Sequence, residues 1–111
     1  MTFQKNVATL MATFFLVFTM LNPALAADRR VKIVNNTGYT IVEFYGSNVG
    51  SDSWEEDILG YDVIPSGRAM MINFDDNSGY CMFDFKAVFD DGDVLTKKRI
   101  NVCEIGTYTY H

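Results

Sequence analysis

The only two cysteines of the chain stand at the two open ends of one hairpin pattern. Two strand-like runs, 80–89 and 94–103, flank an Asp-Asp-Gly-Asp sequence at 90–93. Asp-Gly is favoured in a two-residue type I′ turn, because both central residues of that turn need positive φ. With no third cysteine to choose, the sequence predicts a Cys81–Cys103 disulfide. Closing a loop of this size should stabilise the domain by on the order of 3 kcal/mol. The alternative, two buried thiols, belongs to a reducing compartment.

The alternation of apolar residues predicts which side of each run is buried. Side chains alternate between the two faces of a strand. The buried set should be the odd positions of 80–89 and, in the second run, Val94, Thr96, Ile100 and Val102. A turn at Asp91-Gly92 aligns these faces and places Phe83 opposite Ile100. Cys103 then lies on the wrong face, so we expect a bulge or a break in pairing near 101–102.

The first 26 residues have the pattern of a secretory signal peptide. Lys5 precedes an uncharged apolar run at 7–21, and an Ala-Leu-Ala sequence at 24–26 supplies small residues at the −3 and −1 positions of a cut. A retained membrane anchor is the competing interpretation, but the run is shorter than the roughly 20 residues of a membrane span. We therefore expect residues 1–26 to be cleaved, no membrane anchor afterwards, and a periplasmic or secreted domain at 27–111.

The domain that remains after cleavage is acidic. Loss of Lys5 leaves eight Lys and Arg against fourteen Asp and Glu, a net charge near −6. Nucleic acids and anionic membranes are polyanions, so neither is expected as a partner. The length is that of one domain with a modest core, for which a disulfide is a useful staple.

Short β-branched and aromatic runs predict an all-β fold. Besides the two runs of the cysteine hairpin, we expect strands at 31–34, 39–46, 61–64, 68–74 and 107–111. The first two of these, joined by Asn-Asn-Thr-Gly, have the pattern of a second hairpin. About seven strands, frequent turn signals and no long helical pattern predict a single antiparallel β-sandwich with one disulfide.

The longest stretch without a strand pattern, 47–59, contains the only tryptophan, Trp54. Ser51 or Ser53 is placed to cap a short helical turn that begins at Trp54. Two roles for Trp54 remain open: it plugs one end of the core together with neighbouring apolar residues at 58–59, or it lies exposed and stacks on a ligand.

Two acidic loops raise the question of a metal site. If the strands run up and down, the loops at 47–59 and 75–79 lie at one end of the domain and the Asp-Gly turn lies at the other. Calcium takes hard oxygen ligands, and extracellular modules bind it weakly. The alternative is that these residues form turns and keep the surface soluble. The candidate ligands are Asp52, Glu55, Glu56, Asp57, Asp75, Asp76 and Asn77.

Residue types on which most enzymes depend are scarce. The single histidine, His111, ends the chain, where a general base is poorly held in place. No catalytic residue is assigned, and calcium is the one cofactor considered. We expect a binding or structural module of the periplasm or cell exterior, whose partner is a protein or an envelope component. The alternative is a calcium-binding module on the acidic loops, with metal-dependent hydrolysis as its chemistry.

A resemblance to known proteins extends over nearly the whole domain. The segments that carry it are 36–39, 44–47, 52–60, 72–76 and 81–84. The chain resembles a group of small exported proteins of Gram-negative, rhizobial-type bacteria. The resemblance implies export and a one-domain fold, and it implies no activity. Some members carry an argininosuccinate lyase label. That label implies a long, mostly helical, tetrameric enzyme with a Gly-Ser-Ser-x-Met-Pro loop. This chain is much shorter and does not contain that loop sequence.

Overall fold

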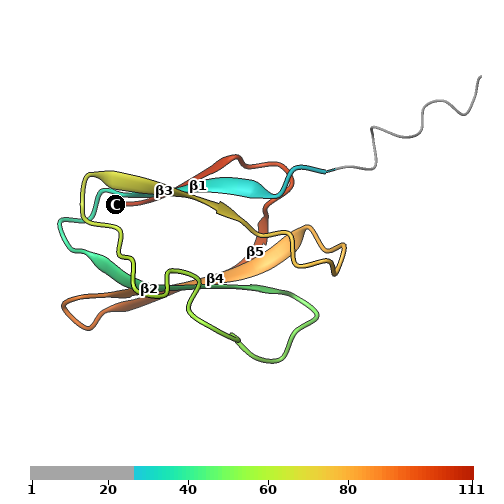
Figure 1. Cartoon of the computed structure of the whole chain (residues 1–111), viewed down its shortest axis with the longest axis horizontal. Coiled ribbons are helices and arrows are strands. Elements are labelled where there is room, and N and C mark those ends of the chain that lie inside the picture. The colour runs from blue at the N-terminus through green and yellow to red at the C-terminus, as the bar shows by residue number, and fades with distance from the viewer. Residues whose placement is uncertain (1–26) are drawn as a thin grey trace, which may run out of the picture.

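The computed structural model describes residues 27–111, and the predicted signal peptide lies outside these residues. Two three-stranded sheets, in the orders β3-β1-β6 and β2-β4-β5, form two layers (Figure 1). The prediction of an all-β sandwich with one disulfide is confirmed, with six strands in place of about seven. The strands are β1 (Arg30–Asn35), β2 (Ile41–Asn48), β3 (Arg68–Asn73), β4 (Met82–Phe89), β5 (Val94–Asn101) and β6 (Thr107–Tyr110).

Three details of the predicted architecture are corrected. The run at 61–64 is not a strand: Asp62 N–H donates to Leu59 O to close a turn (2.9 Å), and only Ile64 forms a bridge, to Ile41. β6 is an edge strand as predicted, but it pairs parallel to β1, so the sandwich is not antiparallel throughout. No helical turn forms at Trp54, because Glu55 adopts a left-handed φ of 67°.

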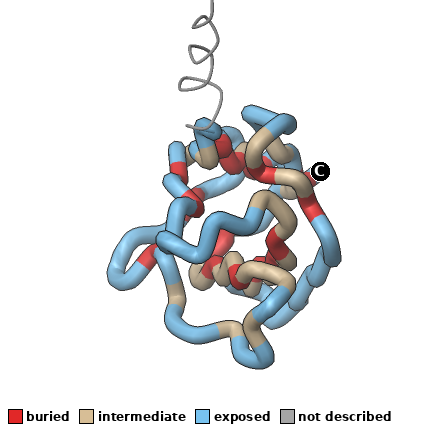
Figure 2. Tube along the Cα trace, turned by 90° about the vertical axis from the view of Figure 1, so that its right-hand side faces the viewer, coloured by how far each residue is buried: buried red, intermediate tan, exposed pale blue. Residues whose placement is uncertain are grey.

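The core lies between the two sheets and is dominated by aromatic rings. The odd positions of β4 are buried as predicted, and Figure 2 shows buried positions, in red, alternating with other residues along the trace. Phe85 stacks on Phe74 with ring centroids 4.8 Å apart and meets Phe44 edge-on at 5.2 Å. A Cβ at Gly46 would overlap the Phe74 ring, so glycine allows these sheets to approach closely.

The turn between β4 and β5 differs from the predicted type I′ turn. Gly92 N–H donates to Phe89 O (2.9 Å), and Gly92 alone in this turn has positive φ, at 92°. Type I′ would require positive φ at both central residues, which the preceding aspartate does not adopt. The loop is therefore one residue longer, and Val88 lies opposite Val94.

A bulge restores the predicted register farther along the hairpin. A bulge or a break in pairing was expected near 101–102; the pairing ends there, and a bulge lies between Phe83 and Phe85, where Arg99 adopts a φ of 60°. Beyond it, Phe83 pairs with Ile100 as predicted. Because the register differs by one before the bulge, Val94 and Thr96 are exposed and their predicted core positions are wrong, whereas Ile100 and Val102 are buried.

The disulfide joins Cys81 and Cys103, as predicted, with their Cα atoms 5.3 Å apart. Ladder pairing ends at Asn101, and the chain turns over 102–104. Val102 N–H still donates to Cys81 O (2.9 Å), while Cys103 N–H donates to Asn101 Oδ1 (3.1 Å). The expected irregularity at the second cysteine is confirmed.

The predicted hairpin of the first two strands does not form, because β1 and β2 belong to different sheets. The side chain of Asn35, which is 0% exposed, holds their connection. Its amide Nδ2 donates to Tyr39 O (2.6 Å) and to Ile64 O (2.8 Å). Its Oδ1 accepts from Thr37 N–H (3.1 Å) and Thr37 Oγ1 (2.7 Å). Asn35 therefore satisfies the backbone where the chain crosses from one sheet to the other.

Replacing Asn35 by Asp should lower the free energy of unfolding by at least about 2 kcal/mol, because a carboxylate cannot donate to the two carbonyl groups and would be buried against them. Urea unfolding measures this change. The matched control is Asn36→Asp, the same chemical change at an exposed neighbour. Equal stability of the two variants would contradict the role assigned to Asn35.

Candidate functional site

Polar side chains gather on the outer face of the β2-β4-β5 sheet. Tyr45 and Ser47 of β2 lie opposite Lys86 and Asp84 of β4. They alternate with core residues, so they lie on the side away from the other sheet. The loop that follows β2 returns along the free edge of that strand: Phe44 N–H donates to Asp57 Oδ1 (2.8 Å) and Phe44 O accepts from the N–H of residue 58 (2.8 Å). The loop is thereby held beside this face.

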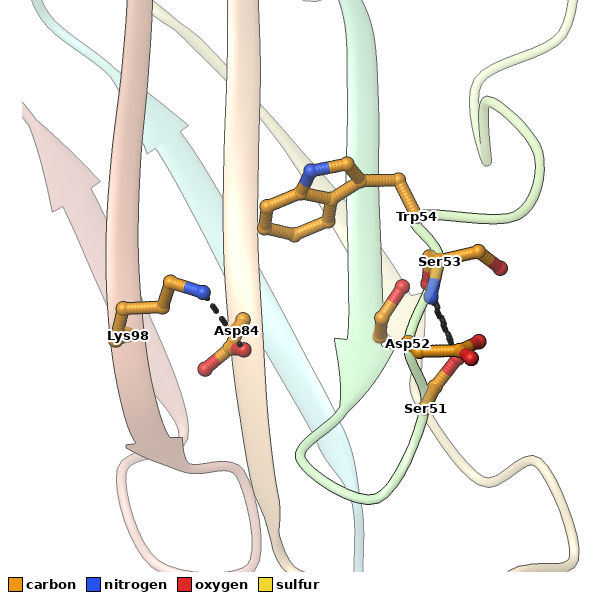
Figure 3. Close-up of a pocket in the computed structure, with 7 residues that line it drawn as sticks. Ser51, Asp52, Ser53, Trp54, Asp84 and Lys98 are labelled. Atoms are coloured by element: carbon orange, nitrogen blue, oxygen red, sulfur yellow. Dashed lines mark hydrogen bonds and ion pairs between the residues drawn. The ribbon is translucent and has the colours of Figure 1, made fainter.

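Trp54 extends from this loop toward β4 and β5 (Figure 3). The Nζ atoms of Lys86 and Lys98 lie 5.2 Å and 5.8 Å from its ring centroid. Lys86 Nζ also lies 4.5 Å from the ring of Tyr45, so this cation is shared by two aromatic rings. Trp54 is half-buried and does not belong to the core cluster, so the prediction that it plugs the core is wrong. The ligand-stacking prediction remains open.

The hydroxyl of Tyr45 fixes one side of this arrangement. It donates to Glu43 Oε1 at 2.6 Å. This hydrogen bond, with smaller effects of burial and of nearby carboxylates, raises the pKa of Tyr45 to about 12. The hydrogen bond to Glu43 holds the Tyr45 hydroxyl, and the ring lies beneath Lys86.

A cavity of about 210 Å³ lies between Trp54 and the sheet. It brings together strand residues that are far apart in the sequence with four consecutive residues of the loop (Figure 3). Its lining is Ser47, Ser51, Asp52, Ser53, Trp54, Asp84 and Lys98.

The hydroxyl of Ser47 is the unusual group of this lining. Ser47 is only 5% exposed, and within residues 27–111 its Oγ has no hydrogen-bond partner. Buried polar groups are nearly always paired, because leaving one unpaired costs about 1–3 kcal/mol. Ser47 belongs to the lining of the cavity, but its hydroxyl oxygen is itself covered, so a ligand in the cavity satisfies this group only when the atoms that cover it move aside.

Asp84 and Lys98 form a loose ion pair beside this hydroxyl. Lys98 Nζ lies 3.5 Å from Asp84 Oδ2, longer than the ~2.8 Å of a tight charge-assisted bond. Asp84 Oδ1 accepts from Arg99 N–H at 2.9 Å, so the backbone at the bulge holds the carboxylate in place. Asp84 is thus fixed, while the ammonium of Lys98, whose side chain is 67% exposed, keeps donors free for a ligand.

The loop residues of the cavity are shaped by local hydrogen bonds. Ser51 Oγ accepts from Ser53 N–H (3.3 Å) and donates to Glu55 Oε2 (3.2 Å). Ser51 therefore organises a turn in place of the predicted helix cap, and the turn presents Asp52 and Ser53 beside Trp54.

The two acidic loops meet at one end of the sandwich, as predicted. Asn48 Nδ2 donates to Asp76 Oδ2 at 2.8 Å. Burial would raise the pKa of Asp76, but hydrogen bonds from Ser78 and Asn48 outweigh it and the pKa is lowered. The Asp-Gly turn lies elsewhere, because Asp90 accepts from Thr40 N–H.

The candidate calcium ligands are not assembled. Within residues 27–111, no group of three or more His, Cys, Asp or Glu is placed to hold a metal ion. Instead, three carboxylates cap backbone N–H groups: Asp57 accepts from Phe44 and Leu59, Asp75 from Asn77, and Asp76 from Ser78. Of the predicted set Asp52, Glu55, Glu56, Asp57, Asp75, Asp76 and Asn77, the three residues Asp57, Asp75 and Asp76 thus have the turn-forming role of the alternative.

We expect calcium chloride and sodium chloride at equal ionic strength to shift the melting temperature by the same amount, because a specific shift requires a site formed in the folded state. Differential scanning fluorimetry measures both shifts. Asp75→Asn should behave like the parent chain, since its amide oxygen still accepts from Asn77 N–H. A larger calcium shift that this variant abolishes would reinstate the metal site.

Of the cavity residues, sequence reasoning singled out Trp54 for ligand stacking and Asp52 as a candidate metal ligand. As site residues it missed Ser47, Ser51, Ser53, Asp84 and Lys98. The predicted strand stopped at Gly46, so Ser47 was assigned to the loop. Alternation did place Asp84 on the outer face of its strand. Which loop covers that face is a tertiary property, and no local pattern carries it.

No family model matches the chain, and no curated protein or solved structure is significantly similar to it. Within residues 27–111, no helix is long and apolar enough to cross a membrane. The geometry of the chain itself therefore carries the functional interpretation.

Proposed function

We propose that this protein is an exported binding module that holds a small polar ligand in the cavity beneath Trp54. The observation that carries the proposal is the Ser47 hydroxyl, buried in the cavity lining without a partner. Trp54 supplies an aromatic wall, and Asp84 and Lys98 supply an acceptor and a donor. A few converging polar groups around an aromatic surface are typical of small-molecule sites. The ligand is a free solute or part of a protein or envelope component.

Binding agrees with this site better than hydrolysis does. A serine nucleophile needs a base within hydrogen-bond reach, and Ser47 Oγ has no partner within residues 27–111. The carboxylate of Asp84 is engaged by Arg99 N–H and Lys98. These groups are arranged to orient a ligand.

Export is supported by the disulfide, and the predicted cut keeps the contacts beside it. A disulfide persists in oxidising compartments. Arg29 Nε donates to Tyr80 O (2.8 Å) and its NH2 group donates to Gly79 O (3.0 Å), next to Cys81. A cut after Ala26 therefore keeps this anchor beside the disulfide in the mature chain.

Intact-mass analysis of protein recovered from the periplasm or medium should show a chain that begins at Ala27 and lacks two hydrogens, as the disulfide requires. Reduction before measurement should restore those two mass units. A full-length chain retained in the membrane fraction would contradict the export proposal.

Ser47→Ala should raise the free energy of unfolding by up to about 1 kcal/mol, because it removes a buried hydroxyl that has no partner. The same variant should weaken ligand binding. Tyr110→Phe is the matched control: the Tyr110 hydroxyl is also buried without a partner within residues 27–111, but Tyr110 packs against Phe44 and Phe89 in the core. It should stabilise the fold and leave binding unchanged.

The binding measurement uses Trp54, the only tryptophan, as a fluorescent reporter. A panel of neutral sugars, amino acids and nucleosides at millimolar concentrations is titrated into the parent chain and both variants. At least one class should change the emission saturably, with a weaker response in Ser47→Ala alone. No saturable response to any class, or an equal response of all three proteins, would overturn the proposed function.

A further inference from the structure

We propose that the ligand of this cavity is a neutral sugar ring, an inference that rests on the proposed function. Charges of both signs stand around the cavity. Asp84 and Lys98 form an ion pair in its lining, Asp52 of the loop adds a carboxylate, and Lys86 places an ammonium group near the Trp54 ring. A cationic ligand would meet the two ammonium groups near Trp54, and an anionic ligand would meet Asp52 and Asp84. A ligand without net charge avoids both repulsions.

The cavity offers donors and acceptors side by side. Asp84 Oδ2 and Lys98 Nζ lie 3.5 Å apart. Adjacent hydroxyls of a sugar ring suit such a pair, because one hydroxyl donates to the carboxylate while its neighbour accepts from the ammonium. The Ser47 hydroxyl both donates and accepts, so it can bond a third hydroxyl once the atoms that cover it move aside. A purely apolar ligand would leave all three groups desolvated and unpaired.

Trp54 completes the match. A sugar ring has hydroxyls at its edge and C–H groups on its faces. The C–H groups carry partial positive charge and can lie on the electron-rich face of the indole. The indole already attracts the ammonium groups of Lys86 and Lys98, and a sugar ring would lie on the surface that they leave open. The volume of about 210 Å³ lies below the roughly 300–1,000 Å³ of pockets for drug-sized ligands, which favours one ring over a longer chain.

The test compares D-glucose, D-galactose and D-mannose, as methyl glycosides, with neutral nucleosides and with zwitterionic amino acids. Trp54 fluorescence and saturation-transfer NMR are measured on the oxidised domain. Sugars should show saturable binding and transfer at ring C–H protons. Asp84→Asn should weaken sugar binding roughly tenfold, because it replaces a charged acceptor while its Oδ1 still accepts from Arg99 N–H. Asp62→Asn, the same change at an exposed turn, should have no effect.

The outcomes separate the two proposals. If nucleosides or amino acids bind in a Ser47-dependent manner and sugars do not, the sugar assignment is overturned while the binding function stands. If no class binds, both are overturned. If sugars bind equally to the Asp84→Asn and Asp62→Asn variants, the cavity is not their site and the assignment fails.

Discussion

The buried amide of Asn35 determines how this chain divides into two sheets. Local turn chemistry at 35–38 favours a tight hairpin, yet β1 and β2 separate. Asn35 stabilises the crossing from β1 to β2, because its side chain hydrogen-bonds the carbonyl groups of Tyr39 and Ile64 and the N–H of Thr37. Without that amide, the crossing would lose the bonds that tie residues 37, 39 and 64 together, and Ile64 O would keep only its bond from Ile41 N–H. The rest of the topology follows, because β1 is free to pair with β3 and β6 while β2 joins β4.

The candidate site depends on the same division. Once β2 is the edge of the second sheet, the N–H and C=O of Phe44 are free to bond the returning loop at residues 57 and 58. That loop carries Trp54 across the outer face, above Lys86 and Lys98. The cavity is therefore formed by an edge strand that pairs with a loop, which also shields the edge from another chain.

Sequence patterns predicted what depends on neighbours along the chain. Alternation identified Phe83 and Phe85 as core, and the cysteine spacing identified the disulfide, because both signals are local to one hairpin. The strand partners of β1 were not predictable, since pairing between distant segments is decided by three-dimensional packing. Trp54 shows what a sequence pattern cannot predict. As the only tryptophan it was predicted to have a special role, but its position on the outer face depends on packing against β4 and β5.

The turn and the bulge each add one residue to the hairpin. They explain why the predicted register is correct near the disulfide and wrong by one residue near the turn. The three-residue turn shifts the pairing near Val88, and the bulge between Phe83 and Phe85 reverses the shift. The reversal keeps Phe83 opposite Ile100 in the core and leaves Cys103 within reach of Cys81. The bulge also places Lys98 and Arg99 next to Asp84. The carboxylate of Asp84 accepts from Lys98 Nζ and from the backbone N–H of Arg99. The donor–acceptor pair of the cavity is thus a product of the bulge that the disulfide-linked hairpin requires.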